Sequence, residues 1–121
     1  MLCIERLMSD IGITTKYKGY YYLTDALQMC LNNETGQLKI TKEIYPQVAT
    51  RHGATSSRVE QNIRFAKEHS FSTRRDKLEE IAGFSLEKIP SNTEFLAMLT
   101  EHLKKTGEET PSPADPIPPR A

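Results

Sequence analysis

Apolar residues recur at intervals of three and four along nearly the whole chain, and no credible alternating apolar–polar run is present. Intervals of three and four place side chains on one face of an α-helix, whereas a half-buried strand needs an interval of two. The spacing therefore predicts an all-α fold of about six helices and no strands. The predicted helices cover residues 2–11, 20–31, 41–52, 56–71, 74–84 and 91–105.

Residues that begin and end helices support these boundaries. Gly12 and Gly53 are expected to end the first and third helices, because glycine is the usual residue just past a helix C-terminus. Thr41 can cap the third helix, and Pro46 near its first turn costs little beyond one backbone hydrogen bond. The inner face of this third helix is predicted to carry Ile44, Tyr45, Val48, Ala49 and His52.

The last predicted helix can begin at Ser91 or Asn92. Its apolar stripe is broader than a helix covering one side of a core requires. An ordinary core role explains most of that stripe, and pairing between two domains is the alternative. The stripe consists of Phe95, Leu96, Met98, Leu99 and Leu103.

The chain has 121 residues, which corresponds to one domain with a modest core. Its composition changes at Thr106, where "TGEETPSPADPIPPRA" holds five of the seven prolines and one large aliphatic residue. Such a segment cannot bury enough apolar surface to order itself. We therefore expect a domain over residues 1–105 and a disordered, acidic, proline-rich tail over residues 106–121.

Charge is unevenly distributed along the chain. The formal net charge of zero argues against a general polyanion binder. However, residues 40–75 carry seven Lys and Arg against three Asp and Glu, whereas residues 76–121 carry five against nine. Local charge decides where an anionic partner docks. The predicted fourth helix lies in this basic segment and is the candidate binding element.

Several functional classes find no support in the sequence. Two isolated cysteines, Cys3 and Cys30, form neither a disulfide framework nor a metal motif, so a cytoplasmic location is expected. The N-terminus has no signal peptide or membrane span. We expect no cofactor, no metal site and no enzymatic activity, because no catalytic constellation appears and the histidines are dispersed. These histidines are His52, His69 and His102.

The third and fourth predicted helices meet at "RHGATSS", a short connection that contains glycine. Two helices joined in this way, with a polar second helix, are typical of a helix-turn-helix. Ala49 suits the small position of the first helix, Gly53 the turn, and Val59 the apolar position that locks the pair. The pattern predicts a DNA-binding module, although small helical domains also contain such turns by chance.

The fourth helix has a narrow apolar stripe of Val59, Ile63 and Ala66, with Ser70 on the same side. The opposite side mixes cations, amides and carboxylates. Arginine can bind guanine bidentately, glutamine can bind adenine, and glutamate can accept from cytosine. A merely solvated helix has a similar composition, so this face alone leaves both interpretations open.

A second polar stretch, "KYKGYYYL", interleaves lysine with tyrosine and can resemble a platform on which bases stack. We favour packing of Tyr20 and Tyr22 in the core over that alternative.

Five separated blocks of the chain, spread over residues 4–105, resemble the DNA-binding effector domain of the stage 0 sporulation response regulator of endospore-forming bacteria. The blocks are "IG" (11–12), "KGYYYLTDAL" (18–27), "ITKEIYPQVA" (40–49), "SSRVEQNIR" (56–64) and "SNTEFLAML" (91–99). The resemblance implies a six-helix, winged-helix-like domain whose fourth helix, about residues 56–71, enters the major groove of a promoter box. It also implies tandem binding by paired domains and contact with the RNA polymerase sigma factor, for which the acidic residues Asp76, Glu79 and Glu80 are candidates.

Two positions depart from the family pattern. Gln61 stands where the family has a guanine-binding arginine, and Phe65 stands where it usually has histidine. We therefore expect DNA binding to carry over and the exact target sequence to differ. The family's phosphoacceptor receiver domain has no place in this chain, which leaves open whether the chain acts alone or is a fragment.

The predicted function is sequence-specific binding of promoter DNA as a transcription regulator, with a homodimer on tandem sites as a further expectation. The alternative is a protein-interaction module that pairs with full-length regulators and modulates them without productive DNA recognition. The candidate DNA-binding residues are Ser56, Ser57, Arg58, Glu60, Gln61, Arg64, Phe65, Lys67, Arg74 and Arg75.

Overall fold

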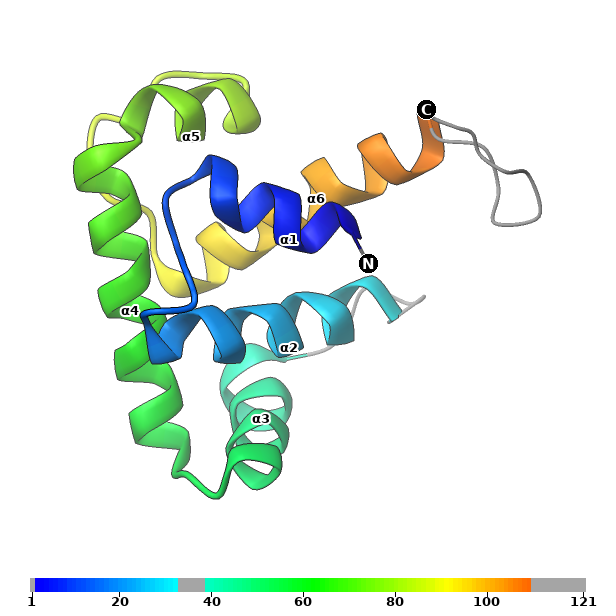
Figure 1. The fold of residues 1–121 in the computed structure, drawn as a ribbon, viewed down its shortest axis with the longest axis vertical. Helices are drawn as coiled ribbons and strands as arrows, with labels where there is room; N and C mark the ends of the chain where they lie inside the picture. Colours follow the sequence, from blue (N-terminus) through cyan, green and yellow to red (C-terminus); the bar gives the residue numbers. More distant parts are fainter. Residues whose placement is uncertain (1, 33–38, 110–121) are drawn as a thin grey trace.

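The computed structural model describes residues 2–32 and 39–109, and these residues form helices and loops without any strand (Figure 1). The all-α fold predicted from the sequence is confirmed, with six α-helices and one π-helical turn in the described residues. The elements are α1 (Leu2–Asp10), α2 (Lys18–Asn32), η1 (Ile40–Ile44), α3 (Tyr45–His52), α4 (Ser56–Thr73), α5 (Arg75–Ala82) and α6 (Asn92–Glu109).

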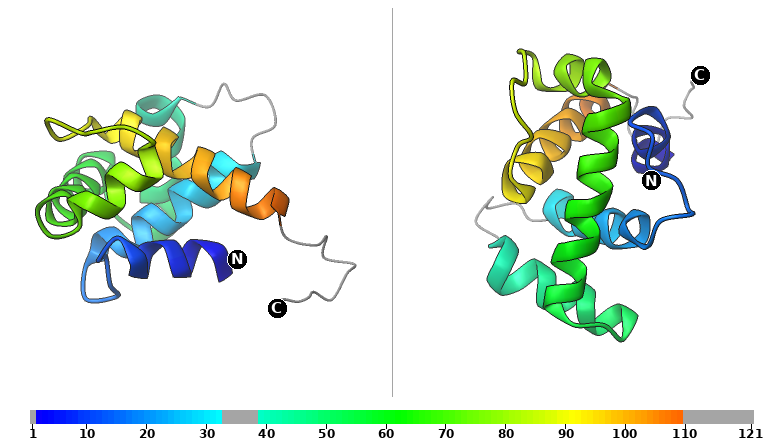
Figure 2. Two further views of the ribbon diagram at one scale, coloured as in Figure 1. Left: turned by 90° about the horizontal axis from the view of Figure 1, so that it is seen from above. Right: turned by 90° about the vertical axis from the view of Figure 1, so that its left-hand side faces the viewer.

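α4 runs the length of the molecule and connects α3 at one end to α5 at the other (Figure 1). α1, α2 and α6 all lie on one side of α4, and its other side forms an outer face of the molecule (Figure 2). Val59, Ile63 and Ala66 point into the core and are at most 1% exposed, as their helical spacing predicted. α4 is therefore half core and half surface, which is what an element that presents side chains to a partner requires.

The apolar stripe of α6 also belongs to the core. Its four large residues that point inward are at most 4% exposed, and Met98 at the edge is partly buried. The core interpretation of this stripe is confirmed, because these side chains are already covered by the protein itself. They are Phe95, Leu96, Leu99 and Leu103.

A left-handed glycine ends α1, as predicted. Gly12 has φ 81°, and the N–H of Ile13 donates to the carbonyl of Met8 at 2.9 Å. The N–H of Gly12 donates to the carbonyl of Ser9 at 3.1 Å, which completes a Schellman motif. Ile13 is then buried, so the chain leaves α1 along the core and enters α2.

The third predicted helix begins differently from the prediction. Residues 40–44 form the π-helical turn η1, in which the N–H of Ile44 donates to the carbonyl of Lys39 at 3.1 Å. Thr41 lies inside this turn and caps nothing, so the predicted cap is wrong. Pro46 provides the physical reason, because its ring has no N–H and crowds the preceding turn, which a wider π-turn accommodates.

Ser91, and not Asn92, caps α6. The Ser91 hydroxyl accepts a hydrogen bond from the N–H of Glu94 at 3.1 Å, and the Glu94 carboxylate accepts one from the N–H of Ser91 at 3.0 Å. Asn92 has a different role. Its amide donates to the hydroxyl of Tyr45 at 3.0 Å and to the carbonyl of Glu60 at 3.3 Å, which ties the start of α6 to both α3 and α4.

α6 extends to Glu109, four residues beyond the predicted end of the domain at residue 105. The first residues of the predicted tail are therefore helical. The predicted disorder of residues 110–121 falls outside the described residues.

Candidate nucleic-acid interface

Three residues, Gly53 to Thr55, connect α3 to α4. Gly53 has φ 62°, and the N–H of Ala54 donates to the carbonyl of Ala49 at 2.9 Å, so the end of α3 is another Schellman turn. The hydroxyl of Thr55 then accepts from the N–H of Arg58 at 3.1 Å and caps α4. The buried side chains of Ala49 and Val59 hold the two helices together, as the helix-turn-helix prediction requires.

A cluster of polar contacts fixes α3 to α2 on the outer side of this turn. The Asp25 carboxylate lies 2.6 Å from Nε2 of His52 and 3.7 Å from the guanidinium of Arg51. The ring of Tyr22 packs edge-on against His52, with centroids 5.1 Å apart. His52 was expected on the inner face of its helix, but it lies at the surface, because a carboxylate on α2 is within reach there.

The outward face of α4 carries five exposed candidate residues within its first three turns. They follow the turn directly and are all exposed. One side of α4 is not covered by other helices (Figure 2). Ser56 and Glu60 are half-buried beside them. The structure therefore brings together most of the residues that the sequence singled out. The exposed five are Ser57, Arg58, Gln61, Arg64 and Phe65.

Lys67 lies apart from this group. It is only 6% exposed, and burial lowers the pKa of its ammonium group below the usual lysine value. Lys67 was predicted from the sequence to bind DNA, but its position about 80° from Val59 turns it toward the protein. A buried cation of this kind does not fit a contact with phosphate.

Arg74 and Arg75 lie at the opposite end of α4, about 25 Å from its first turn. The guanidinium of Arg75 donates to the carbonyl of Leu86, lies 3.4 Å from the Glu79 carboxylate and sits 5.0 Å from the centre of the Phe71 ring. Arg75 therefore holds the loop after α5 in place. Arg74 is exposed and remains compatible with a phosphate contact.

An ion pair modifies the charge of the outward face. Arg64 donates to the carboxylate of Glu60 one turn earlier on the same helix. Among the residues whose side chains the structure describes, Arg58 forms no ion pair, so its charge is the less compensated of the two. The two arginines therefore differ in how readily each can bind an anion.

The ring of Phe65 packs against the ring of Tyr17, a contact that the sequence did not reveal. This side chain is 59% exposed, and its ring centroid lies 6.2 Å from that of Tyr17 in the loop before α2. Tyr17 in turn packs on His69, with centroids 5.0 Å apart and its hydroxyl 3.4 Å from Nε2. The tyrosine-rich run was the only feature of the sequence that pointed to this contact. No local pattern in the sequence shows that Tyr17 reaches α4.

The other tyrosines of that run are mainly structural. Tyr22 is 5% exposed and Tyr20 is partly buried against the core, which confirms the packing interpretation. No group of three or more His, Cys, Asp or Glu residues in the described part of the chain could hold a metal ion. Nor does any helix within residues 2–32 and 39–109 have the length and apolar character needed to cross a membrane.

Taken together, a short glycine turn between two packed helices and an exposed polar face on the second define a helix-turn-helix DNA-binding domain. Residues 4–103 match the family described as the sporulation initiation factor Spo0A C terminal, and the chain belongs to this family. It is therefore a DNA-binding effector domain of the sporulation type that acts in transcription regulation, and its family is not one of enzymes. The resemblance seen in the five sequence blocks is confirmed.

Proposed function

We propose that this domain binds a specific promoter sequence by placing the N-terminal half of α4 in the major groove. The observation that carries the proposal is the uncovered group of Ser57, Arg58, Gln61, Arg64 and Phe65 directly after the helix-turn-helix turn. The helix-turn-helix geometry presents the first turns of the second helix to base edges. The apolar stripe on the other side of α4 holds that helix rigidly against the core.

The side chains of this group have complementary roles in the proposal. Arg58 is free to bind guanine or a phosphate, and Gln61 has the amide geometry that pairs with adenine. The first turn, at Ser56 and Ser57, supplies backbone N–H groups and hydroxyls at the positive end of the helix, where a phosphate binds favourably. Because Gln61 replaces a cation, we expect a box with adenine where related domains select guanine.

The acidic residues of α5 belong to a separate surface. Asp76 and Glu80 are exposed, whereas the Glu79 carboxylate accepts a hydrogen bond from the N–H of Leu86 at 2.8 Å. If this surface contacts a basic helix of the polymerase sigma factor, Asp76 and Glu80 provide the contact and Glu79 supports the loop. Pairing of two domains on tandem boxes completes the proposed mechanism.

The experiment is selection of duplexes from a random library, followed by anisotropy titrations of the enriched box at two salt concentrations. We expect the box to bind about 10³-fold or more tightly than bulk DNA. Arg58→Ala should lose about 1–3 kcal/mol of binding free energy. The matched control Arg6→Ala removes an exposed arginine on α1 and should leave affinity unchanged.

Weak binding without enrichment, lost on addition of salt, would contradict specific recognition. It would favour the alternative in which the domain acts through a protein partner.

A further inference from the structure

The connection between α1 and α2 passes beside the middle of α4 (Figure 1, Figure 2). Its last part, residues 14–18, is called the flanking loop below. Two hydrogen bonds to Thr14 fix its backbone: the carbonyl accepts from the N–H of Tyr17 at 3.1 Å, and the hydroxyl accepts from the N–H of Lys16 at 3.4 Å. Lys16 and Lys18 are both exposed, and no acidic residue occurs between positions 11 and 19.

Tyr17 holds the flanking loop against α4. Its ring contacts that of Phe65, with centroids 6.2 Å apart, and Gly19 just after the loop packs on the backbone of α4 at Asn62. Phe65 and Asn62 lie about 40° and 100° around the helix from Gln61, in the same direction. Since Gln61 belongs to the proposed base-contacting group, the loop lies on one flank of that group.

This position determines what the loop can contact when DNA is bound. In the proposed function, on which this inference rests, α4 lies in a major groove about 12 Å wide, and a helix with its side chains is itself about 10–12 Å across. The groove then has no room for a loop packed against the side of the helix. Such a loop lies over the sugar-phosphate backbone that borders the groove, where lysine side chains bind phosphates.

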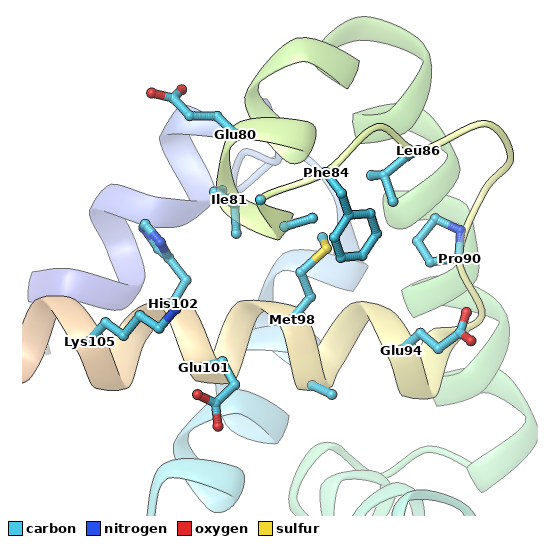
Figure 3. Close-up of a pocket in the computed structure, with 13 residues that line it drawn as sticks. Glu80, Ile81, Phe84, Leu86, Pro90, Glu94, Met98, Glu101, His102 and Lys105 are labelled. Carbon is cyan, nitrogen blue, oxygen red and sulfur yellow. The ribbon is translucent and has the colours of Figure 1, made fainter.

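The opposite flank of α4, bordered by α6, carries different charges (Figure 2). A groove of about 700 Å³ lies there between α6, α5 and the loop after α5 (Figure 3). The titratable residues described in its lining are three glutamates, one histidine and one lysine, namely Glu80, Glu94, Glu101, His102 and Lys105. Three carboxylates against one ammonium group make this surface unfavourable for a polyanion. A contact with DNA outside the major groove is therefore better provided by the flanking loop.

We propose that Lys16 and Lys18 bind phosphates of the DNA backbone beside the major groove, and that Tyr17 positions them. Neither lysine forms an ion pair with any residue whose side chain the structure describes, so both ammonium groups are available to an anion. Phosphate contacts fix the register and orientation of a protein on the duplex. Because the flanking loop is attached to α4 at Phe65, its contacts set the rotation of the helix in the groove.

The first test measures how binding of the full chain to DNA depends on salt concentration. Each phosphate contact contributes about 0.9 to the slope of log K against log salt concentration. Lys16→Ala and Lys18→Ala should each reduce the slope by about 0.9, and the double variant by about 1.8. The matched double variant of Lys104→Ala and Lys105→Ala removes the same charge from exposed positions on α6 and should leave the slope unchanged. Equal slopes for the two double variants would overturn the proposal.

A neutral phosphate analogue tests the contact directly. Methylphosphonate replaces the phosphates within and beside the selected box one at a time. At one or two positions the replacement should weaken binding of the unaltered chain and have no effect on the double variant of Lys16→Ala and Lys18→Ala. If every replacement costs the same in both chains, the two lysines contact no phosphate and the proposal fails.

The positioning role of Tyr17 has a separate test. Tyr17→Phe keeps the ring that packs on Phe65 and should preserve the slope. Tyr17→Ala should reduce the slope toward that of the double lysine variant, although both lysines are still present. A slope that Tyr17→Ala leaves unchanged would reject the positioning role.

Failure of this proposal is distinguishable from failure of promoter recognition, because the slopes can also be measured on bulk DNA, where phosphate contacts dominate. An enriched box with slopes independent of Lys16 and Lys18 would refute the loop contact and retain promoter recognition. No enriched box, with slopes that still depend on the two lysines, would refute promoter recognition and retain the loop contact. Absence of any binding to DNA would refute both.

Discussion

Gly19 of α2 lies directly against the backbone of α4 at Asn62. A Cβ atom at position 19 would come within 2.5 Å of the Asn62 carbonyl oxygen and within 2.8 Å of the Cβ of Ala66. Both neighbours belong to a helix that is fixed in the core and cannot yield as a flexible side chain would. The absence of a side chain at Gly19 therefore sets how closely α2 packs against α4.

Gly19→Ala should lower the free energy of unfolding by about 1–3 kcal/mol, the usual cost of overpacking. Without the clash, the same change inside a helix would be stabilising, so the sign of the effect is decisive. Urea unfolding measures it. Lys18→Ala, an exposed neighbour, should change stability by less than about 0.5 kcal/mol. Unchanged or increased stability of Gly19→Ala would show that α2 and α4 separate easily.

Glu60→Gln should strengthen nonspecific DNA binding. The substitution removes the carboxylate that pairs with Arg64, and the freed guanidinium can then neutralise a phosphate. Each added phosphate contact steepens the slope of log K against log salt concentration by about 0.9. Glu68→Gln makes the same charge change at an exposed position on α4 and should alter the slope less. Equal slopes for the two variants would contradict a role for the ion pair.

Gln61→Arg should move the preference at one base pair from adenine to guanine, because a guanidinium binds guanine bidentately. Selection from the random library, repeated with the variant, provides the measurement. Gln28→Arg adds the same charge on α2 and should not change the selected box. An unaltered preference in the Gln61→Arg library would mean that position 61 does not face a base.

Phe65 should contact the methyl group of a thymine, since it is the exposed apolar side chain on the outward face of α4. Replacing single thymines of the selected box by deoxyuridine removes only that methyl group. One replacement should cost about 0.8 kcal/mol, the value of a buried methyl or methylene group. In the Phe65→Ala chain the same replacement should cost nothing, whereas Phe84→Ala should behave as the unaltered chain. Sensitivity that persists in Phe65→Ala would assign the contact elsewhere.

Lys67→Met should raise the free energy of unfolding by about 0.5–1 kcal/mol, within the range of single stabilising substitutions. Burial lowers the pKa of Lys67 in the folded state below 10.5, so at neutral pH the folded protein bears the cost of a desolvated charge. As the pH rises through the folded pKa toward 10.5, the folded protein releases this proton first and gains stability. The advantage of the variant should therefore shrink at alkaline pH. The DNA affinity of the variant should not change. A large loss of affinity would indicate that Lys67 contacts DNA.

The helical pattern of the sequence was enough to place α4 and its buried face. Val59, Ile63 and Ala66 repeat at the α-helical period, and a helix with this stripe has only one way to face the core. Gly53 similarly reveals the turn, because its conformational preference acts locally. Features that depend on the residues of one helix or one turn were therefore predictable.

Features that depend on distant segments were not. Tyr17 and Phe65 meet only because the loop before α2 passes beside α4. Lys67 looked like a solvated cation in the sequence, but the folded domain buries it to 6% exposure. Thr41 failed as a cap because Pro46, five residues later, favours a π-turn over a regular first turn. In each case a tertiary or medium-range constraint outweighs the local preference.

α4 is a single helix of 18 residues, about 27 Å long, with the proposed DNA contacts at one end and α5 at the other. A rigid rod of this kind fixes both the separation and the rotation between the two surfaces. In the proposed binding mode, a protein bound at α5 would therefore occupy a defined angular position around the duplex. Moving the promoter box by about 5 base pairs, half of a 10–10.5 base-pair helical turn, would carry that protein to the opposite side of the DNA. If the proposed promoter binding and the polymerase contact at α5 both hold, the geometry of α4 makes the phase of the box relative to the polymerase site, and not only their distance, a determinant of regulation.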